Sequence, residues 1–192
     1  MSGAPFILAS ASPRRRALLA QIGVKPAKII PADLDETPMR GEIPRDYVGR
    51  ISQEKAAAIA AKHEGSIILA ADTTVACGRR ILPKTDDEQS ARACLMLMSG
   101  CAHRVLTGVA LIGSNGATAA RIVETRVKVR RLDKYAMDEY IECGEWNGKA
   151  GGYAIQGLFE KHIVSLTGSY SNVVGLPLYE TANLLRGAGV IK

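Results

Sequence analysis

Residues 66–77 read SIILAADTTVAC, and this stretch decides the fold. It is a near-continuous run of apolar and β-branched residues, which is typical of a strand buried on both faces of a sheet. Short runs of this kind alternate along the chain with longer segments of helical periodicity, so the sequence predicts an α/β protein. One residue breaks the pattern, because Asp72 places an acidic side chain inside the apolar run.

The remaining elements are read outward from this strand. Further strands are predicted at residues 6–9, 28–31, 103–112, 119–129 and 162–166, and helices at residues 13–22, 45–62, 87–98, 133–143 and 177–186. Asn115-Gly116 between two alternating runs is a strong hairpin signal. No repeat, low-complexity linker or domain boundary interrupts the pattern, so residues 1–192 are expected to form a single α/β domain.

Composition limits the class of protein. The 192 residues include 25 basic and 19 acidic side chains, and the net charge of +6 favours an anionic partner. The four cysteines lack metal-type spacing and the chain has three histidines, which argues against a structural zinc site. No apolar run approaches the ~18 residues that span a bilayer, and no secretory pattern is present. We therefore expect a cytoplasmic protein without a membrane partner.

Residues 8–19 read LASASPRRRALL and raise an electrostatic question. Ser12 suits the N-cap of a helix and Pro13 its first position, where a missing N–H does no harm. Three arginines then follow at a helix end that already carries partial positive charge. Each cation there is unfavourable by roughly 0.3–1 kcal/mol.

The three arginines admit two interpretations. They could form a solvated basic surface, and because successive helical residues point about 100° apart, at least Arg16 should face solvent. Alternatively, the strand–helix junction binds phosphate, since free N–H groups, the hydroxyls of Ser10 and Ser12, and the guanidiniums of Arg14 and Arg15 match phosphate oxygens. We favour phosphate binding. The site is not a Walker loop, because no GK[ST] follows a glycine-rich turn.

The acidic residues admit more than one role. A buried Asp72 must be paired, metal-bound or at the exposed C-terminal end of its strand. It is either a structural turn-capping residue or a general base or metal ligand at the edge of a parallel sheet, where ligands of open α/β folds collect. Asp33, Asp35 and Glu36 could supply oxygen ligands to Mg²⁺, or could belong to a solvated loop.

Two lysines and a glycine-rich segment complete the candidates. Lys55 and Lys84 could neutralise phosphate charge or lie at the surface. Residues 148–157, GKAGGYAIQG, contain enough glycine for tight turns or close backbone approach to a ligand. Gln156 in this segment offers the donor and acceptor needed to read a base edge, or it stabilises the loop.

These motifs together resemble the Maf family of nucleoside triphosphate pyrophosphatases. The resemblance extends in family order from residue 7 to about residue 186, and its blocks are LASASPRRRALL, DLDET with GEIPRDYVGRISQEKA, AADTTV, ILPKTDD, LMSGCAHRVLTGVAL, GKAGGYAIQG and GSYSNVVGLPLYET. It implies an inosine-triphosphatase-like fold, in which a long twisted mixed sheet flanked by helices forms two lobes around a central cleft. It also implies hydrolysis between the α and β phosphates of a nucleoside triphosphate, giving the monophosphate and pyrophosphate.

The resemblance further implies a role for individual residues. A divalent cation, Mg²⁺ or Mn²⁺, is expected on Glu36 and Asp72, and Asp72 matches the proton acceptor. The IQG version of the glycine-rich segment resembles the branch acting on dTTP and UTP. Phosphate contacts are implied for Ser10, Arg14, Arg15, Lys55 and Lys84, and positions linked to substrate choice are Arg15, Thr73 and Gln156.

The chain departs from the family pattern at Ala17, often acidic, at Pro83-Lys84-Thr85, in place of GKP, and at Gly148, in place of aspartate. Two other functions stay open: a non-catalytic nucleotide sensor, and a nucleic-acid-binding regulator of cell division. The second is disfavoured because aromatic residues make up 5% of the chain and no nucleic-acid motif is present. A homodimer is expected from the family alone.

Overall fold

The structure is a computed structural model that describes residues 4–192. Its strands are β1 (Phe6–Leu8), β2 (Lys28–Ile29), β3 (Ile67–Cys77), β4 (Arg80–Leu82), β5 (Lys84–Thr85), β6 (Ala102–Ile112), β7 (Thr118–Val129), β8 (Lys149–Ala150) and β9 (Ile163–Thr167). Its helices are α1 (Pro13–Gln21), α2 (Pro44–Ala60), α3 (Glu88–Met98), α4 (Lys134–Glu142), α5 (Tyr170–Val174) and α6 (Leu178–Gly187), and η1 (Leu158–His162) is a 3-10 helix.

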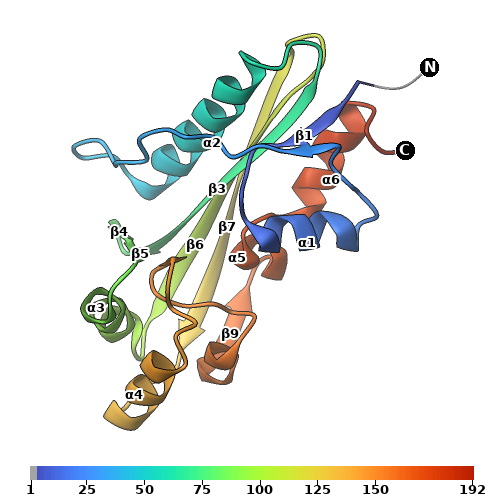
Figure 1. The fold of residues 1–192 in the computed structure, drawn as a ribbon. Coiled ribbons are helices and arrows are strands. Elements are labelled where there is room, and N and C mark those ends of the chain that lie inside the picture. Colours follow the sequence, from blue (N-terminus) through green and yellow to red (C-terminus); the bar gives the residue numbers. More distant parts are fainter. Residues whose placement is uncertain (1–3) are drawn as a thin grey trace.

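The central sheet is mixed, as the resemblance implied. Its strand order is β2-β1-β3-β6-β7-β9, and β4 pairs with β3 outside this path. β1 runs parallel to β2 and β3, whereas β3, β6, β7 and β9 pair antiparallel. Figure 1 shows that β3, β6 and β7 are much longer than their neighbours and form the twisted body of the molecule. The hairpin predicted at Asn115-Gly116 joins β6 to β7.

The strand that decides the fold lies in the middle of this sheet. From Ile67 to Val75, every residue of β3 except Thr73 is buried, which confirms the prediction of a strand covered on both faces. Helix α2 covers one face of β3 and β6. It packs closely because β6 has no side chain at Gly108, where an added Cβ would collide with the backbone carbonyl of Val48 in α2. The main apolar core fills the other face.

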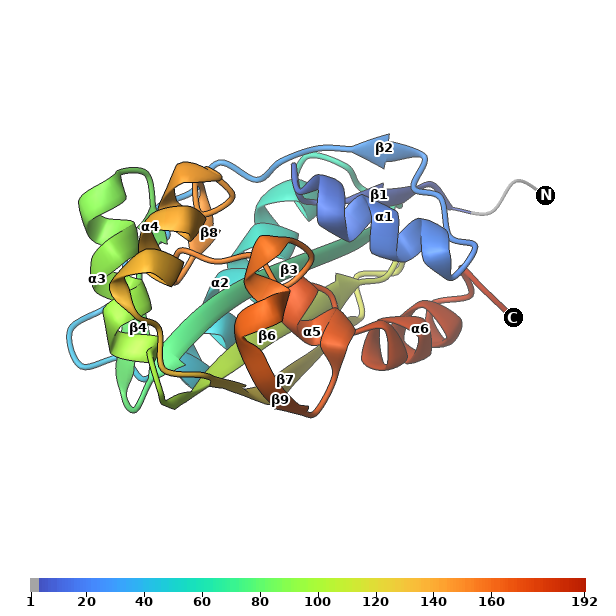
Figure 2. The same ribbon diagram turned by 90° about the horizontal axis from the view of Figure 1, so that it is seen from below.

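The remaining elements gather at the two ends of the long strands. Figure 2 shows α3, α4 and β8 at one end of the sheet, and α1, β1 and α6 at the other. A small second sheet, in which β5 pairs antiparallel with β8, belongs to the first of these ends. The mixed sheet flanked by helices that the resemblance implied is therefore present. None of the helices between residues 4 and 192 has the length and apolar character needed to cross a membrane.

The sequence missed only short elements. Neither α5 nor η1 was predicted, because each has five residues and is too short to show a helical period. Strands β4, β5 and β8 were not predicted either, because they have only two or three residues and show no alternation. All of the long helices and strands lie within two residues of their predicted bounds.

Candidate active site

The junction between β1 and α1 forms as its sequence predicts. Ser12 is the N-cap of α1, and its side chain accepts a hydrogen bond from the backbone N–H of Arg15 at 3.4 Å. Pro13 occupies the first turn. The hydroxyl of Ser10 accepts a further bond from the N–H of Ser12 at 3.3 Å. The junction is thus fixed locally, with Ser10 and Ser12 both facing the same cavity.

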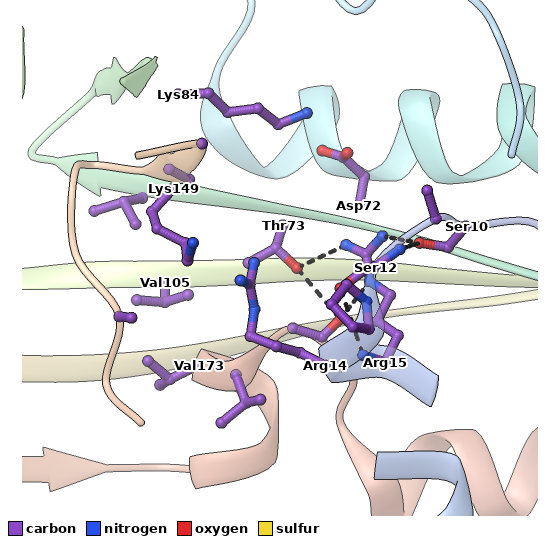
Figure 3. Close-up of a pocket in the computed structure, with 18 of the residues that line it drawn as sticks. Ser10, Ser12, Arg14, Arg15, Asp72, Thr73, Lys84, Val105, Lys149 and Val173 are labelled. Carbon is purple, nitrogen blue, oxygen red and sulfur yellow. Dashed lines mark hydrogen bonds between the residues drawn. The ribbon is translucent and has the colours of Figure 1, made fainter. Parts of the chain in front are cut away.

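The three arginines point in different directions. Arg14 and Arg15 line the cavity (Figure 3), whereas Arg16 is exposed and does not line it. Burial lowers the pKa of both Arg14 and Arg15, and the nearby negative charge of Asp72 opposes that effect at Arg15. The prediction that at least Arg16 faces solvent is confirmed.

Arg15 connects three segments that are far apart in the sequence. Its Nε donates to the carbonyl oxygen of Gly175 at 2.8 Å, and its Nη1 donates to Oγ of Ser10 at 2.9 Å. Its Nη2 donates to Oγ1 of Thr73 at 3.2 Å. One planar guanidinium therefore fixes α1, β3 and the end of α5 relative to one another, which a lysine could not do.

A second layer of polar contacts supports this connection. Thr73 and Thr107, opposite each other on β3 and β6, have hydroxyl oxygens 2.9 Å apart. The hydroxyl of Thr107 also donates to the carbonyl oxygen of Asn172 in α5 at 3.1 Å. Sequence reasoning did not identify Thr107 or Asn172, because a threonine in a strand and an asparagine in a short helix carry no chemical pattern of their own.

Asp72 lies inside β3 and is 3% exposed. Its Oδ1 is 2.7 Å from Nζ of Lys55, which reaches it from α2. The alternative that placed Asp72 at the exposed C-terminal end of its strand is wrong. So is its placement at the edge of a parallel sheet, because Asp72 faces Gly108 of the antiparallel strand β6. β1 ends at Leu8, opposite Leu69, so β3 continues beyond its parallel neighbour and Asp72 lies on that continuation.

Glu36 joins the same group of charges. Its Oε1 is 2.7 Å from Nζ of Lys55, and its Oε2 is 2.6 Å from Nζ of Lys84. Partial burial raises the pKa of Glu36, but the hydrogen bonds and charges of the two lysines outweigh it, so the net shift is downward. Tyr47 in α2 donates to the carbonyl oxygen of Glu36 at 2.9 Å and fixes the loop.

The other two residues of the acidic loop lie outside the site. Asp33 and Asp35 are both exposed, and neither lines the cavity. Oδ1 of Asp35 accepts a hydrogen bond from the backbone N–H of Thr37 at 2.9 Å. For these two carboxylates the solvated-loop interpretation is confirmed.

The second wall of the cavity comes from the small sheet. β5 carries Lys84 and β8 carries Lys149, on adjacent paired strands. Gln156 follows on the glycine-rich segment and also lines the cavity, although its side chain is exposed and makes no hydrogen bond among the described residues. Lys149 was noticed in the sequence only as a neighbour of glycines, because one lysine in a loop is usually a surface residue.

All the predicted site residues line one cavity of about 540 Å³. They are Ser10, Ser12, Arg14, Arg15, Glu36, Lys55, Asp72, Thr73, Lys84 and Gln156. The cavity has a charged part and an apolar part, the latter formed by Val75, Val105, Tyr153 and Val173. This combination suits a ligand that joins an anionic chain to a flat, partly apolar ring, and the volume is typical of small-molecule sites.

Glu36 and Asp72 are the candidate ligands of a divalent cation. Glu36 and Asp72 are both within 2.7 Å of the same atom, Nζ of Lys55, so their oxygens converge on one point. Across residues 4–192 no group of three His, Cys, Asp or Glu side chains could hold a metal ion. Two carboxylates nevertheless fit Mg²⁺ or Mn²⁺, because Mg²⁺ commonly takes one or two carboxylates and completes its octahedron with water and substrate phosphate.

The chain is similar to proteins of known family. A family model described as "Maf-like protein" matches residues 5–188. The chain is 55% identical over 188 residues to the dTTP/UTP pyrophosphatase of Caulobacter vibrioides, covering 98% of this chain and 97% of the relative. It is 53% identical over 186 residues to the dTTP/UTP pyrophosphatase of Paramagnetospirillum magneticum, covering 97% and 98%.

A solved structure shows the same fold at much lower identity. The HAM1 protein from Coxiella burnetii superposes with a TM-score of 0.53 over 96% of this chain and 100% of that protein, at 15% sequence identity. At this identity the likeness concerns the fold alone. It confirms the expected mixed α/β architecture.

Proposed function

The chain belongs to the family of Maf-like proteins, and from that premise we propose that it hydrolyses dTTP and UTP to the nucleoside monophosphate and pyrophosphate. The observation that carries the proposal is the cavity itself. It places cationic side chains at the N-terminus of α1 and along β5, opposite a buried carboxylate on β3. An enzyme that cleaves a phosphoanhydride needs these two features on either side of the reacting phosphorus.

The chemistry can be assigned to side chains as part of this proposal. Asp72 accepts the proton of a water molecule as the water attacks the α phosphorus, and the bond from that phosphorus to the bridging oxygen breaks to release pyrophosphate. Arg14, Lys55 and Lys84 offset the negative charge on the phosphate oxygens. Ser10 and Ser12, on the β1–α1 junction, contribute hydroxyl groups to the same phosphate site.

A divalent cation would offset further negative charge of the bound triphosphate. Glu36 and Asp72 would hold Mg²⁺ or Mn²⁺, and the bound ion would polarise phosphate oxygens as a Lewis acid. The side chains of the protein perform the remaining tasks. The lysines orient the phosphate chain, and Asp72 holds the proton taken from water.

We assign the preference for pyrimidine nucleotides to three residues that line the cavity, namely Gln156, Thr73 and Arg15. Gln156 can donate and accept hydrogen bonds to a base edge. Thr73 and Arg15, which line the same cavity and are hydrogen-bonded to each other, are assigned by this proposal to substrate choice. The proposal places the enzyme in the cytoplasm, where dTTP and UTP are present, and retains the expectation of a homodimer.

The test is a product analysis. Purified protein is incubated with Mg²⁺ and dTTP, and the nucleotides and phosphates are resolved by anion exchange. We expect dTMP and pyrophosphate in equal amounts. Formation of dTDP and single phosphate would refute cleavage between the α and β phosphates. Tight dTTP binding without turnover, with Mg²⁺ and with Mn²⁺, would favour a nucleotide sensor instead.

A further inference from the structure

The cationic side chains of the cavity fall into two groups. Lys55 and Lys84 are paired with carboxylates, and the guanidinium of Arg15 donates to three protein oxygens. Arg14 and Lys149 differ, since neither forms an ion pair with any acidic side chain in residues 4–192. These two cations are therefore the ones that the protein leaves available to an anion.

Arg14 and Lys149 face each other from opposite walls of the cavity. Arg14 comes from the first turn of α1 and Lys149 from β8 (Figure 3). Burial lowers the pKa of the Lys149 ammonium, and the positive charge of Arg14 lowers it further. Two half-buried cations that repel each other indicate a site completed by a ligand of negative charge.

The backbone fixes Lys149 in this position. The N–H of Gly148 donates to the carbonyl oxygen of Thr85 at 2.7 Å, and the N–H of Gly151 donates to that of Pro83 at 2.9 Å. The hydroxyl of Thr85, a fully buried residue, donates to the carbonyl oxygen of Trp146 at 2.8 Å. Lys149 therefore stands on a short strand that is anchored on both sides, and its Nζ is oriented by a 2.9 Å bond to the carbonyl oxygen of Asn147.

We propose that Lys149 acts with Arg14 as the binding site for the part of the triphosphate that leaves as pyrophosphate. This proposal rests on the proposed function. In-line displacement places the leaving group on the side of the α phosphorus opposite the attacking water. Arg14 and Lys149 line the cavity from the first turn of α1 and from β8, whereas Asp72 lies inside β3 and is paired with Lys55. We therefore assign Arg14 and Lys149 to the departing pyrophosphate, and Asp72 to the attacking water.

The proposal adds a contact that the sequence did not suggest. Ammonium and guanidinium groups bind phosphate oxygens through charge-assisted hydrogen bonds. Loss of one such bond corresponds to roughly 10- to 100-fold weaker binding. Because both cations engage the same anion, loss of the first should reduce the effect of losing the second.

The experiment measures binding of inorganic pyrophosphate, which is independent of turnover. Calorimetric titrations with and without Mg²⁺ compare wild type with Lys149→Met and Arg14→Met. Matched controls are Lys128→Met, an exposed lysine on β7, and Arg16→Met, two residues from Arg14 on the same helix. We expect Lys149→Met and Arg14→Met to weaken pyrophosphate binding about 10- to 100-fold, with less than about twofold change in either control.

Two further variants exclude a structural explanation. Lys149→Arg keeps the charge and should restore pyrophosphate affinity to within a few-fold of wild type. In the double variant Arg14→Met with Lys149→Met, the fold-loss of pyrophosphate affinity should be smaller than the product of the two single losses. Equal pyrophosphate affinity in Lys149→Met and Lys128→Met would overturn the inference. If wild type binds pyrophosphate through Lys149 and Arg14 but releases none from dTTP, the pyrophosphate site stands while its role in turnover and the proposed function fail.

Discussion

Asp72 and Lys55 form a buried ion pair in which Oδ1 and Nζ lie 2.7 Å apart, with exposures of 3% and 7%. We predict that Asp72→Asn abolishes dTTP hydrolysis, with kcat reduced at least about 100-fold, because an amide cannot accept a proton from water. Binding of dTTP should change by less than about tenfold, since the cations of the phosphate site remain. Steady-state kinetics and calorimetry measure the two quantities separately.

This substitution should leave a folded protein. Nζ of Lys55 keeps its 2.7 Å contact with Oε1 of Glu36, so removing the charge of Asp72 does not leave an isolated buried cation. Asp33→Asn, an exposed acidic residue of the nearby loop, is the control and should retain full activity. Wild-type kcat in Asp72→Asn would remove Asp72 from the proposed mechanism.

The charges around Lys55 also predict that the metal ion binds more tightly after the nucleotide than before it. Glu36 and Asp72 carry two negative charges, and Lys55 and Lys84 balance them, so the free site has little attraction for a cation. We expect wild type to bind Mn²⁺ weakly alone and more tightly with dTTP. Lys55→Met should bind Mn²⁺ alone about tenfold or more tightly than wild type, because a repelling charge is removed from beside two carboxylates.

Electron paramagnetic resonance of free Mn²⁺ measures this directly, without any need for turnover. Lys62→Met, which alters an exposed lysine just beyond the end of α2, serves as the matched control and should leave Mn²⁺ affinity unchanged. If Lys55→Met binds Mn²⁺ no better than Lys62→Met, the two carboxylates do not form the metal site.

Much of the fold follows from local sequence. Ser12 caps α1 and Pro13 occupies its first turn because both effects depend on residues within one helical turn. The buried strand at 67–77 and the hairpin through Asn115-Gly116 are likewise local, since they depend on side-chain period and turn chemistry. Such features can be read from one sequence without knowing what lies next to them in space.

The partners of the site residues could not be predicted in this way. Arg15 meets the carbonyl of Gly175, 160 positions away in the chain, and Thr107 meets that of Asn172, 65 positions away. Which charges are paired and which stay free is decided by such long-range contacts. The sequence analysis named Lys55 and Lys84 as phosphate candidates and gave Lys149 no role, yet Lys55 and Lys84 are paired with carboxylates whereas Lys149 forms no ion pair among the described residues.

Because the guanidinium of Arg15 donates to three oxygens, even replacement by lysine should lower the stability of the protein. We predict that Arg15→Lys lowers stability by about 1–3 kcal/mol, because an ammonium cannot reach the oxygens of Gly175, Ser10 and Thr73 in one plane. The KM for dTTP should rise as α1 loses its fixed position. Urea unfolding and kinetics test this, with Arg16→Lys as the control that changes neither.

His103 makes stability depend on pH. It is 1% exposed, its Nε2 lies 2.7 Å from the hydroxyl of Tyr153, and burial lowers its pKa to about 4. The unfolded chain has an ordinary histidine pKa near ~6.5, so between these values the unfolded state binds more protons. Stability should therefore be lost as pH falls through this window, by about 3 kcal/mol in total from this residue.

His103→Gln removes the titrating group and keeps a hydrogen-bonding side chain. The fall in melting temperature between pH 7 and pH 5 should be smaller in this variant than in wild type. His63→Gln, which alters a histidine just beyond α2 and outside the core, should retain the wild-type fall. An unchanged pH dependence in His103→Gln would show that other groups govern acid sensitivity.

Gly108 controls how closely α2 approaches the sheet, and hence where Lys55 lies. A Cβ at this position would overlap the carbonyl of Val48, so Gly108→Ala must push α2 away from β6. We predict a loss of stability of about 1–3 kcal/mol or more, and a lower kcat because Lys55 moves away from Asp72. Gly187→Ala is the control, since no atom lies within 4 Å of its added Cβ, and it should be neutral or slightly stabilising. Denaturant melts and dTTP kinetics on the two variants decide the matter: wild-type stability in Gly108→Ala would mean that α2 does not depend on this contact.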